Sequence, residues 1–260
     1  MKLPFYATGR KRQKTSALFL FRFALLTLAA VLGYSCAVRA QTVTVTGRLE
    51  LIREGASAVQ NSNSSNGIVW LTRIGDAVEP VSMSTGPKQQ LVQKNKSFTP
   101  HLVVVQVGSS VVFPNKDPFF HNVFSLFEGK RFDLGLYEAG SSRTVVFDRE
   151  GISYIFCNIH PEMSAVVVAL KTPYYGISDS RGAVSINDVP AGRYELHAWH
   201  ERAIPESLDS QVRYVQISEA SHSFGILRVA EQQSTPPPHK NKYGQDYDTP
   251  AATDPIYPHP

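Results

Sequence analysis

Apolar and polar residues alternate along much of the chain beyond residue 40. The alternation is clear at Val43, Val45, Leu49 and Leu51, and it returns in residues 103–113, 145–147 and 152–156. Neighbouring side chains of a β-strand point to opposite faces of a sheet, so a period of two predicts strands. No helical stripe extends beyond two turns. Short strands separated by Gly, Pro, Asn and Asp therefore predict an all-β protein built of β-sandwiches.

The chain divides at Thr172-Pro173, directly after an apolar strand over residues 165–170. We assign residues 41–170 to a first sandwich, with its core at residues 97–170, and residues 171–230 to a second, smaller one. Residues 41–96 are the part of this division that stays open. They either extend the first sandwich or pair with the second, in which case the first sandwich is an insertion.

Residues 231–260 contain seven prolines and few large aliphatic side chains. Such a segment buries too little apolar surface to offset the conformational entropy that it would lose on folding. We therefore expect residues 231–260 to form a disordered, Pro-rich tail.

The first 40 residues have the layout of a secretory signal peptide. Basic residues at 10–14 precede an apolar run over residues 23–38, and Val38-Arg39-Ala40 fits a cleavage site before Gln41. The run is shorter than the ~20 residues that a spanning helix needs. We expect residues 1–40 to direct export to the periplasm and to be removed. The alternative is that residues 23–38 remain as a membrane anchor.

The formal net charge of +4 comes from this N-terminal segment. Residues 1–40 hold seven basic residues and no acidic one, so residues 41–260 carry 19 basic against 22 acidic residues. A body without excess positive charge does not favour nucleic-acid binding. The chain also lacks the Gly-x-Ser-x-Gly and His-Glu-x-x-His motifs of hydrolases. We expect neither a nucleic-acid partner nor an enzyme.

Candidate metal ligands gather between residues 157 and 163. Cleavage before Gln41 would remove Cys36 and leave Cys157 as the one cysteine, in an oxidising compartment where a lone thiol needs protection. His160 and Met163 follow on a predicted loop between two strands, and His121 precedes an earlier apolar stretch. Donors on neighbouring loops at one end of a sandwich can meet at one point.

The types of donor select the metal. Two imidazoles, one thiolate and a weak axial thioether are the ligands of blue-copper sites. Zinc rarely takes a thioether, and calcium and magnesium prefer oxygen donors. Sulfur and imidazole donors suit both Cu(I) and Cu(II), so the ion can change oxidation state with little rearrangement. We expect one type 1 copper ion and no open coordination position for a substrate.

Residues 97–170 resemble a cupredoxin, the small Greek-key β-sandwich of blue-copper proteins, and the loop Cys-x-x-His-Pro-x-Met is similar to that of amicyanin. The resemblance implies His121, Cys157 and His160 as strong ligands and Met163 as the weak axial one. It also implies that Asn122 ties the two ligand-bearing loops together behind the metal. The long segment 124–137 departs from the family pattern.

Residues 176–229 resemble a transthyretin-like or carboxypeptidase-regulatory-like β-sandwich. The resemblance rests on Asp179-Ser180-Arg181-Gly182 and on the stretch from Val189 to Leu196, followed by Trp199-His200. It implies a fold and no activity. Together the two parts are similar to exported bacterial proteins of the methylamine-utilisation or plastocyanin-like type.

The sequence thus predicts an exported mononuclear blue-copper protein that transfers single electrons between redox-protein partners. Two alternatives stay open. One is a copper-binding protein that stores, delivers or senses the metal. The other is a cell-envelope interaction module whose copper site is structural or vestigial. A membrane is expected as a partner only if the N-terminal segment is retained.

Overall fold

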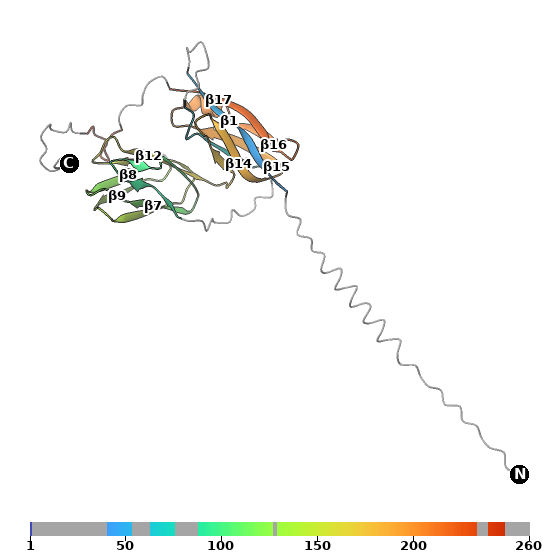
Figure 1. The fold of residues 1–260 in the computed structure, drawn as a ribbon, viewed down its shortest axis with the longest axis horizontal. Coiled ribbons are helices and arrows are strands. Elements are labelled where there is room, and N and C mark those ends of the chain that lie inside the picture. The colour runs from blue at the N-terminus through green and yellow to red at the C-terminus, as the bar shows by residue number, and fades with distance from the viewer. Residues whose placement is uncertain (2–40, 54–62, 76–87, 127–128, 233–238, 248–260) are drawn as a thin grey trace. The chain divides into compact units, whose positions relative to one another are not determined.

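Strands make up almost all of the regular structure in this computed structural model, and they fall into two sandwiches (Figure 1). The structure describes residue 1 and residues 41–53, 63–75, 88–126, 129–232 and 239–247. In that part of the chain, no helix is long and apolar enough to cross a membrane. The all-β fold class predicted from the alternation is confirmed. The expected signal peptide, and with it the anchor alternative at residues 23–38, lies outside the described residues.

The sandwich formed by residues 88–170 contains ten strands. These are β3 (Gln89–Gln90), β4 (Val92–Gln93), β5 (Phe98–Thr99), β6 (Leu102–Gln106), β7 (Ser109–Pro114), β8 (His121–Ser125), β9 (Phe132–Tyr137), β10 (Ser142–Phe147), β11 (Gly151–Cys157) and β12 (Ser164–Leu170). One sheet has the order β6-β12-β11-β8-β9, a second has the order β10-β7-β3, and β4 pairs with β5. Phe113, Val123 and Ile155 are fully buried in its core. We call this part the inserted sandwich.

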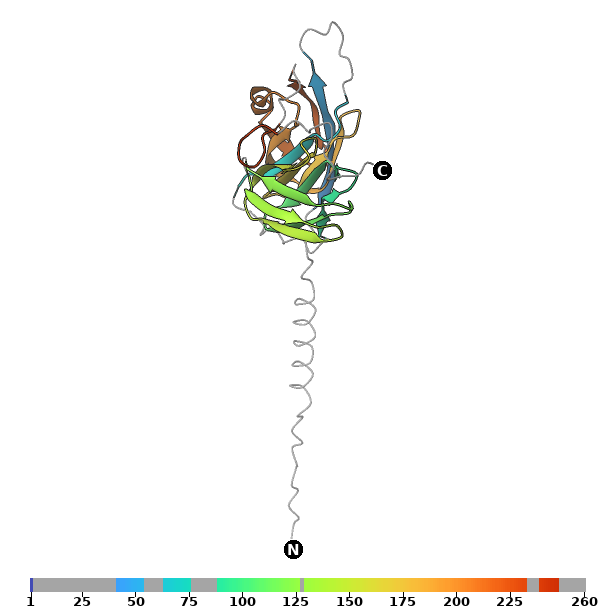
Figure 2. The same cartoon turned by 90° about the vertical axis from the view of Figure 1, so that its left-hand side faces the viewer.

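The other sandwich combines strands from both sides of the inserted one. Its elements are β1 (Thr42–Ile52), β2 (Ile68–Arg73), β13 (Tyr175–Ile177), β14 (Ala183–Pro190), β15 (Gly192–Trp199), β16 (Arg213–Ile217), β17 (Ser223–Ala230) and the short helix α2 (Pro205–Asp209). The sheets have the orders β14-β1-β17 and β13-β2-β15-β16. Figure 2 shows β1, in blue, from a second side. We call this part the outer sandwich.

For β1 and β2 this strand pairing agrees with the second arrangement left open for residues 41–96, in which the first sandwich is an insertion, whereas β3 and β4 lie with the strands of the inserted sandwich. β1 is antiparallel to β14 and parallel to β17, and β2 pairs with β13 and β15. The chain therefore begins one sandwich, completes the other over residues 88–170 and then returns to the first. The alternation in β1 reports a buried face, and that face covers the core of the outer sandwich.

The inner face of β1 is shaped to close this core. Val45, Leu49 and Leu51 are buried, and Gly47 lies in the same row. A Cβ atom at residue 47 would approach the Phe224 ring to 2.2 Å. Glycine is therefore needed at this position, because it leaves the space that the aromatic ring fills.

Strands β6 and β12 are buried on both faces. Val103, Val105 and Val167 lie in the core of the inserted sandwich. The alternate residues, among them Val104 and Val168, join a separate apolar cluster that includes Ile68 and Trp199 of the outer sandwich. Burial on both faces explains why these strands are apolar at almost every position.

Part of the expected disordered tail has a defined conformation. Glu231 is 2% exposed and pairs with Arg53 and Arg202. Residues 239–247 form a turn that contacts Phe156, Cys157 and Asn158. Expected disorder over the whole of residues 231–260 therefore does not hold for these residues. Hydrogen bonds and the stack of His239 on Phe156 hold this segment, although it contains few large aliphatic side chains.

The role of β1 in the outer sandwich can be tested by cavity creation. Leu49→Ala removes a fully buried side chain from the strand between β14 and β17, and we expect it to lower the free energy of unfolding by about 2–5 kcal/mol. Urea unfolding followed by circular dichroism measures the change. The control is Ile226→Ala, at a position in β17 that is 43% exposed, which should cost far less. Equal effects of the two substitutions would contradict this role.

Candidate metal centre

Two paired strands bring the candidate ligands to one end of the inserted sandwich. β8 begins at His121, and β11 ends at Cys157. The strands are antiparallel with Val123 opposite Cys157, and the pairing continues where the Asn158 N–H donates to the Asn122 carbonyl over 2.9 Å. The start of one strand and the end of the other therefore lie side by side.

The loop after Cys157 closes on itself. The Met163 N–H donates to the His160 carbonyl at 3.0 Å, and the Cys157 N–H donates to the Met163 carbonyl at 3.3 Å. These bonds hold the loop tightly enough for His160 to fold back toward Cys157. Met163 is 1% exposed and belongs to the same buried cluster as Cys157.

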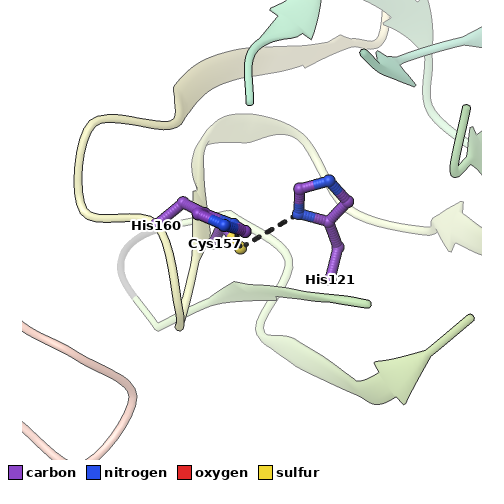
Figure 3. A group of neighbouring side chains, drawn as sticks. All are labelled: His121, Cys157 and His160. Carbon is purple, nitrogen blue, oxygen red and sulfur yellow. Dashed lines mark hydrogen bonds between the residues drawn. The ribbon is translucent and has the colours of Figure 1, made fainter. Parts of the chain in front are cut away.

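Two imidazole nitrogens face one sulfur atom (Figure 3). The Nδ1 atoms of His121 and His160 each lie 3.6 Å from the Cys157 Sγ atom. One donor atom from each of the three residues falls within 4.8 Å of the others. His121 and Cys157 are fully buried and His160 is 8% exposed. The arrangement is a closed three-donor group with its two histidines aligned for Nδ1 ligation.

Asp117 fixes the protonation pattern of His121. The His121 Nε2 atom lies 2.9 Å from the Asp117 carboxylate, so the proton sits on Nε2 and the Nδ1 lone pair faces the sulfur. Asp117 is 4% exposed and accepts the backbone N–H groups of Asn95 and Lys96 at 2.6 and 3.0 Å. A buried carboxylate behind a histidine is typical of metal sites, where it orients the ring and raises its basicity.

Burial sets the ionisation of the donors in the metal-free protein. Burial raises the pKa of the Cys157 thiol, although the backbone amides of Asn122, Ile159 and His160 oppose this shift. Burial, reinforced by His121, lowers the pKa of His160 to about 4, and burial also lowers the pKa of His121. The pocket therefore favours neutral imidazoles and gains from a cation that would replace the thiol proton.

Four ligands are predicted from the sequence, and the structure gathers three of them around one point. His121, Cys157 and His160 converge, while Met163 lies in the adjoining core. Asn122 acts differently from the expectation. Its side-chain Nδ2 donates to Asp133 at 2.6 Å, and it is the backbone carbonyl of Asn122 that joins the two ligand-bearing loops.

Asp117 is not among the residues predicted from the sequence, although the sequence carries a local signal for it. In Asn115-Lys116-Asp117, the Asn115 side chain accepts the Asp117 N–H at 3.0 Å and donates to the Phe119 carbonyl at 2.7 Å. An asparagine that bonds two residues ahead forms a turn of known type. The turn brings the Asp117 carboxylate to the ring of His121, four residues further along the chain. The alternation of residues along a strand does not predict this contact.

Phe119 lies against both histidines. Its ring centroid is 5.3 Å from that of His121 and 5.4 Å from that of His160. Phe120 beside it is 51% exposed, whereas Phe124 is fully buried. Of these phenylalanines, Phe124 thus belongs to the core, Phe119 contacts the histidines and Phe120 lies at the surface. Phe127 lies outside the described residues.

Comparison with known proteins gives structural likeness alone. No protein-family model and no curated protein matches the chain. A purple cupredoxin from Nitrosopumilus maritimus is 23% identical, with 32% of this chain and 99% of that one covered and a TM-score of 0.29. A reduced amicyanin variant is 19% identical over 32% of this chain and 81% of that one, with a TM-score of 0.30. A copper-containing nitrite reductase from Thermus scotoductus is 18% identical over 39% and 26%, with a TM-score of 0.32.

Loss of the Asp117 carboxylate should weaken metal binding. In Asp117→Ala, His121 loses the group that fixes its ring, so we expect the affinity of the three-donor group for a metal ion to fall by about 10–100-fold. Competition with a chromogenic chelator, with copper as the test ion, measures the affinity. Asp117→Asn keeps a hydrogen-bond acceptor and should lose less. Asp148→Ala, which removes an exposed carboxylate paired with Lys130, is the control. An affinity equal to that of the control would refute the role of Asp117.

The neutral histidines make the stability of the metal-free protein depend on pH. Unfolding returns the pKa of His160 from about 4 to 6.5, so between these values the unfolded chain binds more protons than the folded one. This contribution is fully present above pH 6.5 and is lost as the pH falls toward 4. His160→Asn should therefore show a smaller loss of unfolding free energy than the parent between pH 7 and 4.5, measured in urea. Parallel curves for the two proteins would contradict the assignment.

Proposed function

We propose that this protein is an exported blue-copper protein that transfers one electron at a time. The observation that carries the proposal is that the Nδ1 atoms of His121 and His160 both lie 3.6 Å from the buried Cys157 Sγ. Nitrogen and sulfur donors in such a closed group are ligands that copper prefers. His121, Cys157 and His160 would hold the ion, with Met163 as the weaker fourth ligand.

Copper, when bound, supplies a centre that gains and loses one electron. The chain supplies a site that changes little between the two states. Asp117 holds the His121 ring, and the loop hydrogen bonds hold His160 and Met163 relative to Cys157. Ligands held in this way resist rearrangement when the charge of the ion changes, which favours fast electron exchange over catalysis.

His160 is the natural route for the electron. Of the three converging residues it alone has a measurable exposed fraction, 8%. Ile159, which precedes His160 in the chain, is 37% exposed, and Phe120, which precedes His121, is 51% exposed. We propose that redox-protein partners approach this end of the inserted sandwich, and that export to the periplasm by residues 1–40 brings the protein to them.

The thiolate is the part of the site with the clearest optical signature. We expect the oxidised, copper-loaded protein to show an intense thiolate-to-copper band in the visible range, and Cys157→Ala to abolish it. Met163→Leu should keep the band and raise or lower the reduction potential, because a weak axial ligand tunes the metal more than it holds it. Visible spectroscopy and voltammetry provide the measurements. A band that survives in Cys157→Ala would disprove the assignment.

The same sample separates a carrier from a storage or delivery protein. A carrier should give a reversible one-electron wave and should retain copper through repeated reduction in the presence of a moderate Cu(I) chelator. Rapid, complete transfer of copper to the chelator would favour storage or delivery. A protein that binds copper but gives no reversible wave would favour the interaction module with a structural site.

A further inference from the structure

The C-terminal segment, defined here as residues 239–247, is organised around one asparagine. The Asn241 side chain accepts the backbone N–H groups of Tyr243 and Gln245 at 2.9 and 3.0 Å. The Asn241 N–H in turn donates to the Gln245 carbonyl at 2.8 Å. The segment therefore has a closed local conformation although it is polar and short.

Two hydrogen bonds join the C-terminal segment to the loop that carries the candidate ligands. The Tyr247 hydroxyl donates to the carbonyl oxygen of Cys157 at 2.8 Å, and the Lys242 N–H donates to the Asn158 side chain at 2.9 Å. Burial raises the pKa of Tyr247, so the hydroxyl stays protonated and remains a donor. Both bonds act at the cysteine end of the loop.

A third connection reaches the histidine strand. The Lys242 Nζ atom lies 2.8 Å from the Asp133 carboxylate, whose other oxygen accepts the Asn122 side chain at 2.6 Å. The pKa of Asp133 is low because Lys242 and Asn122 outweigh its desolvation. Asn122 follows His121 directly, so the chain of contacts from Lys242 ends beside a candidate ligand.

Ring stacking adds apolar contact. The His239 ring stacks on Phe156 with centroids 4.0 Å apart and planes inclined by 22°. The Tyr247 ring meets His239 edge-on at 5.2 Å. Phe156 precedes Cys157, so this contact also lies at the cysteine end of the loop.

We propose that the C-terminal segment positions the ligand-bearing loop, residues 157–163, by holding Cys157 and Asn158 against β8, the strand that begins at His121. The metal-dependent part of this proposal rests on the copper function proposed above. Opening of the loop must break the bond from Tyr247, the bond from Lys242 and the stack on Phe156. The segment therefore reduces the population of open loop and slows the release of copper.

The first test needs no metal. We compare the metal-free full chain with Tyr247→Phe, which keeps the ring and removes the donor, and with Tyr214→Phe, a control at a 70% exposed tyrosine in the outer sandwich. Hydrogen exchange of the peptide spanning residues 157–163, read by mass spectrometry, should be about 3–10-fold faster in Tyr247→Phe, as expected for loss of the hydrogen bond to the Cys157 carbonyl. The substitution also removes the 3.3 Å contact of the hydroxyl with His239 Nδ1, which lies within the segment. Exchange in Tyr214→Phe should match the parent.

Truncation provides a second pair of variants. A chain ending at residue 247 keeps the C-terminal segment and should match the parent, whereas a chain ending at residue 238 should show faster exchange at residues 157–163. Peptides from β14 should not change in either chain. Unchanged exchange at residues 157–163 in both Tyr247→Phe and the shorter chain would overturn the proposal, as would a uniform increase over the whole chain.

The second test uses the copper-loaded protein. Transfer of Cu(I) to a chelator should be about 3–10-fold faster from Tyr247→Phe than from Tyr214→Phe. Equal transfer rates would refute the effect on copper release. If the parent protein shows no thiolate-to-copper band, the copper function fails, and the exchange measurements on the metal-free chain still decide whether the segment positions the loop.

Discussion

The pairing of β8 with β11 is the constraint on which the site depends. Because the two strands are antiparallel and Val123 lies opposite Cys157, the start of one strand must meet the end of the other. The bond between the Asn158 N–H and the Asn122 carbonyl extends this contact into the loop. The backbone hydrogen bonds between β8 and β11 therefore set the separation of His121 and Cys157. Only the rotamers of the two side chains remain to be determined by packing.

Strand positions and the ligand loop could be predicted from local sequence, whereas partners distant along the chain could not. The alternation of Val45, Leu49 and Leu51 shows that β1 buries one face. The alternation does not show which sheet packs against that face. The spacing of Cys157 and His160 predicts convergence because both lie on one short loop. Asp117 and Tyr247 reach the same site through turns whose geometry depends on hydrogen bonds, and a pattern of apolar residues does not record these.

The nearly continuous apolar sequence of β6 and β12 has a related explanation. A strand with one solvent-facing side would alternate, but Val103 and Val104 face two different apolar clusters. The second cluster includes Trp199 and Ile68, so the two sandwiches share apolar surface. The share of apolar residues in a strand therefore indicates whether one or both of its faces are buried by other parts of the protein.

The interrupted outer sandwich also imposes an order of events during synthesis. β1 and β2 leave the ribosome long before β14 and β17 exist, so β1 has no partner when it first emerges. Residues 88–170 are contiguous, so the strand pairs of the inserted sandwich can form before the later strands are made, but the face of β6 and β12 that packs on Trp199 stays uncovered until that residue is in place. β2 and β13, which flank the insertion in the chain, pair with each other. A folded insertion restricts the positions of its two ends. Joining the two halves of the outer sandwich therefore costs less entropy than it would across a disordered loop of the same length.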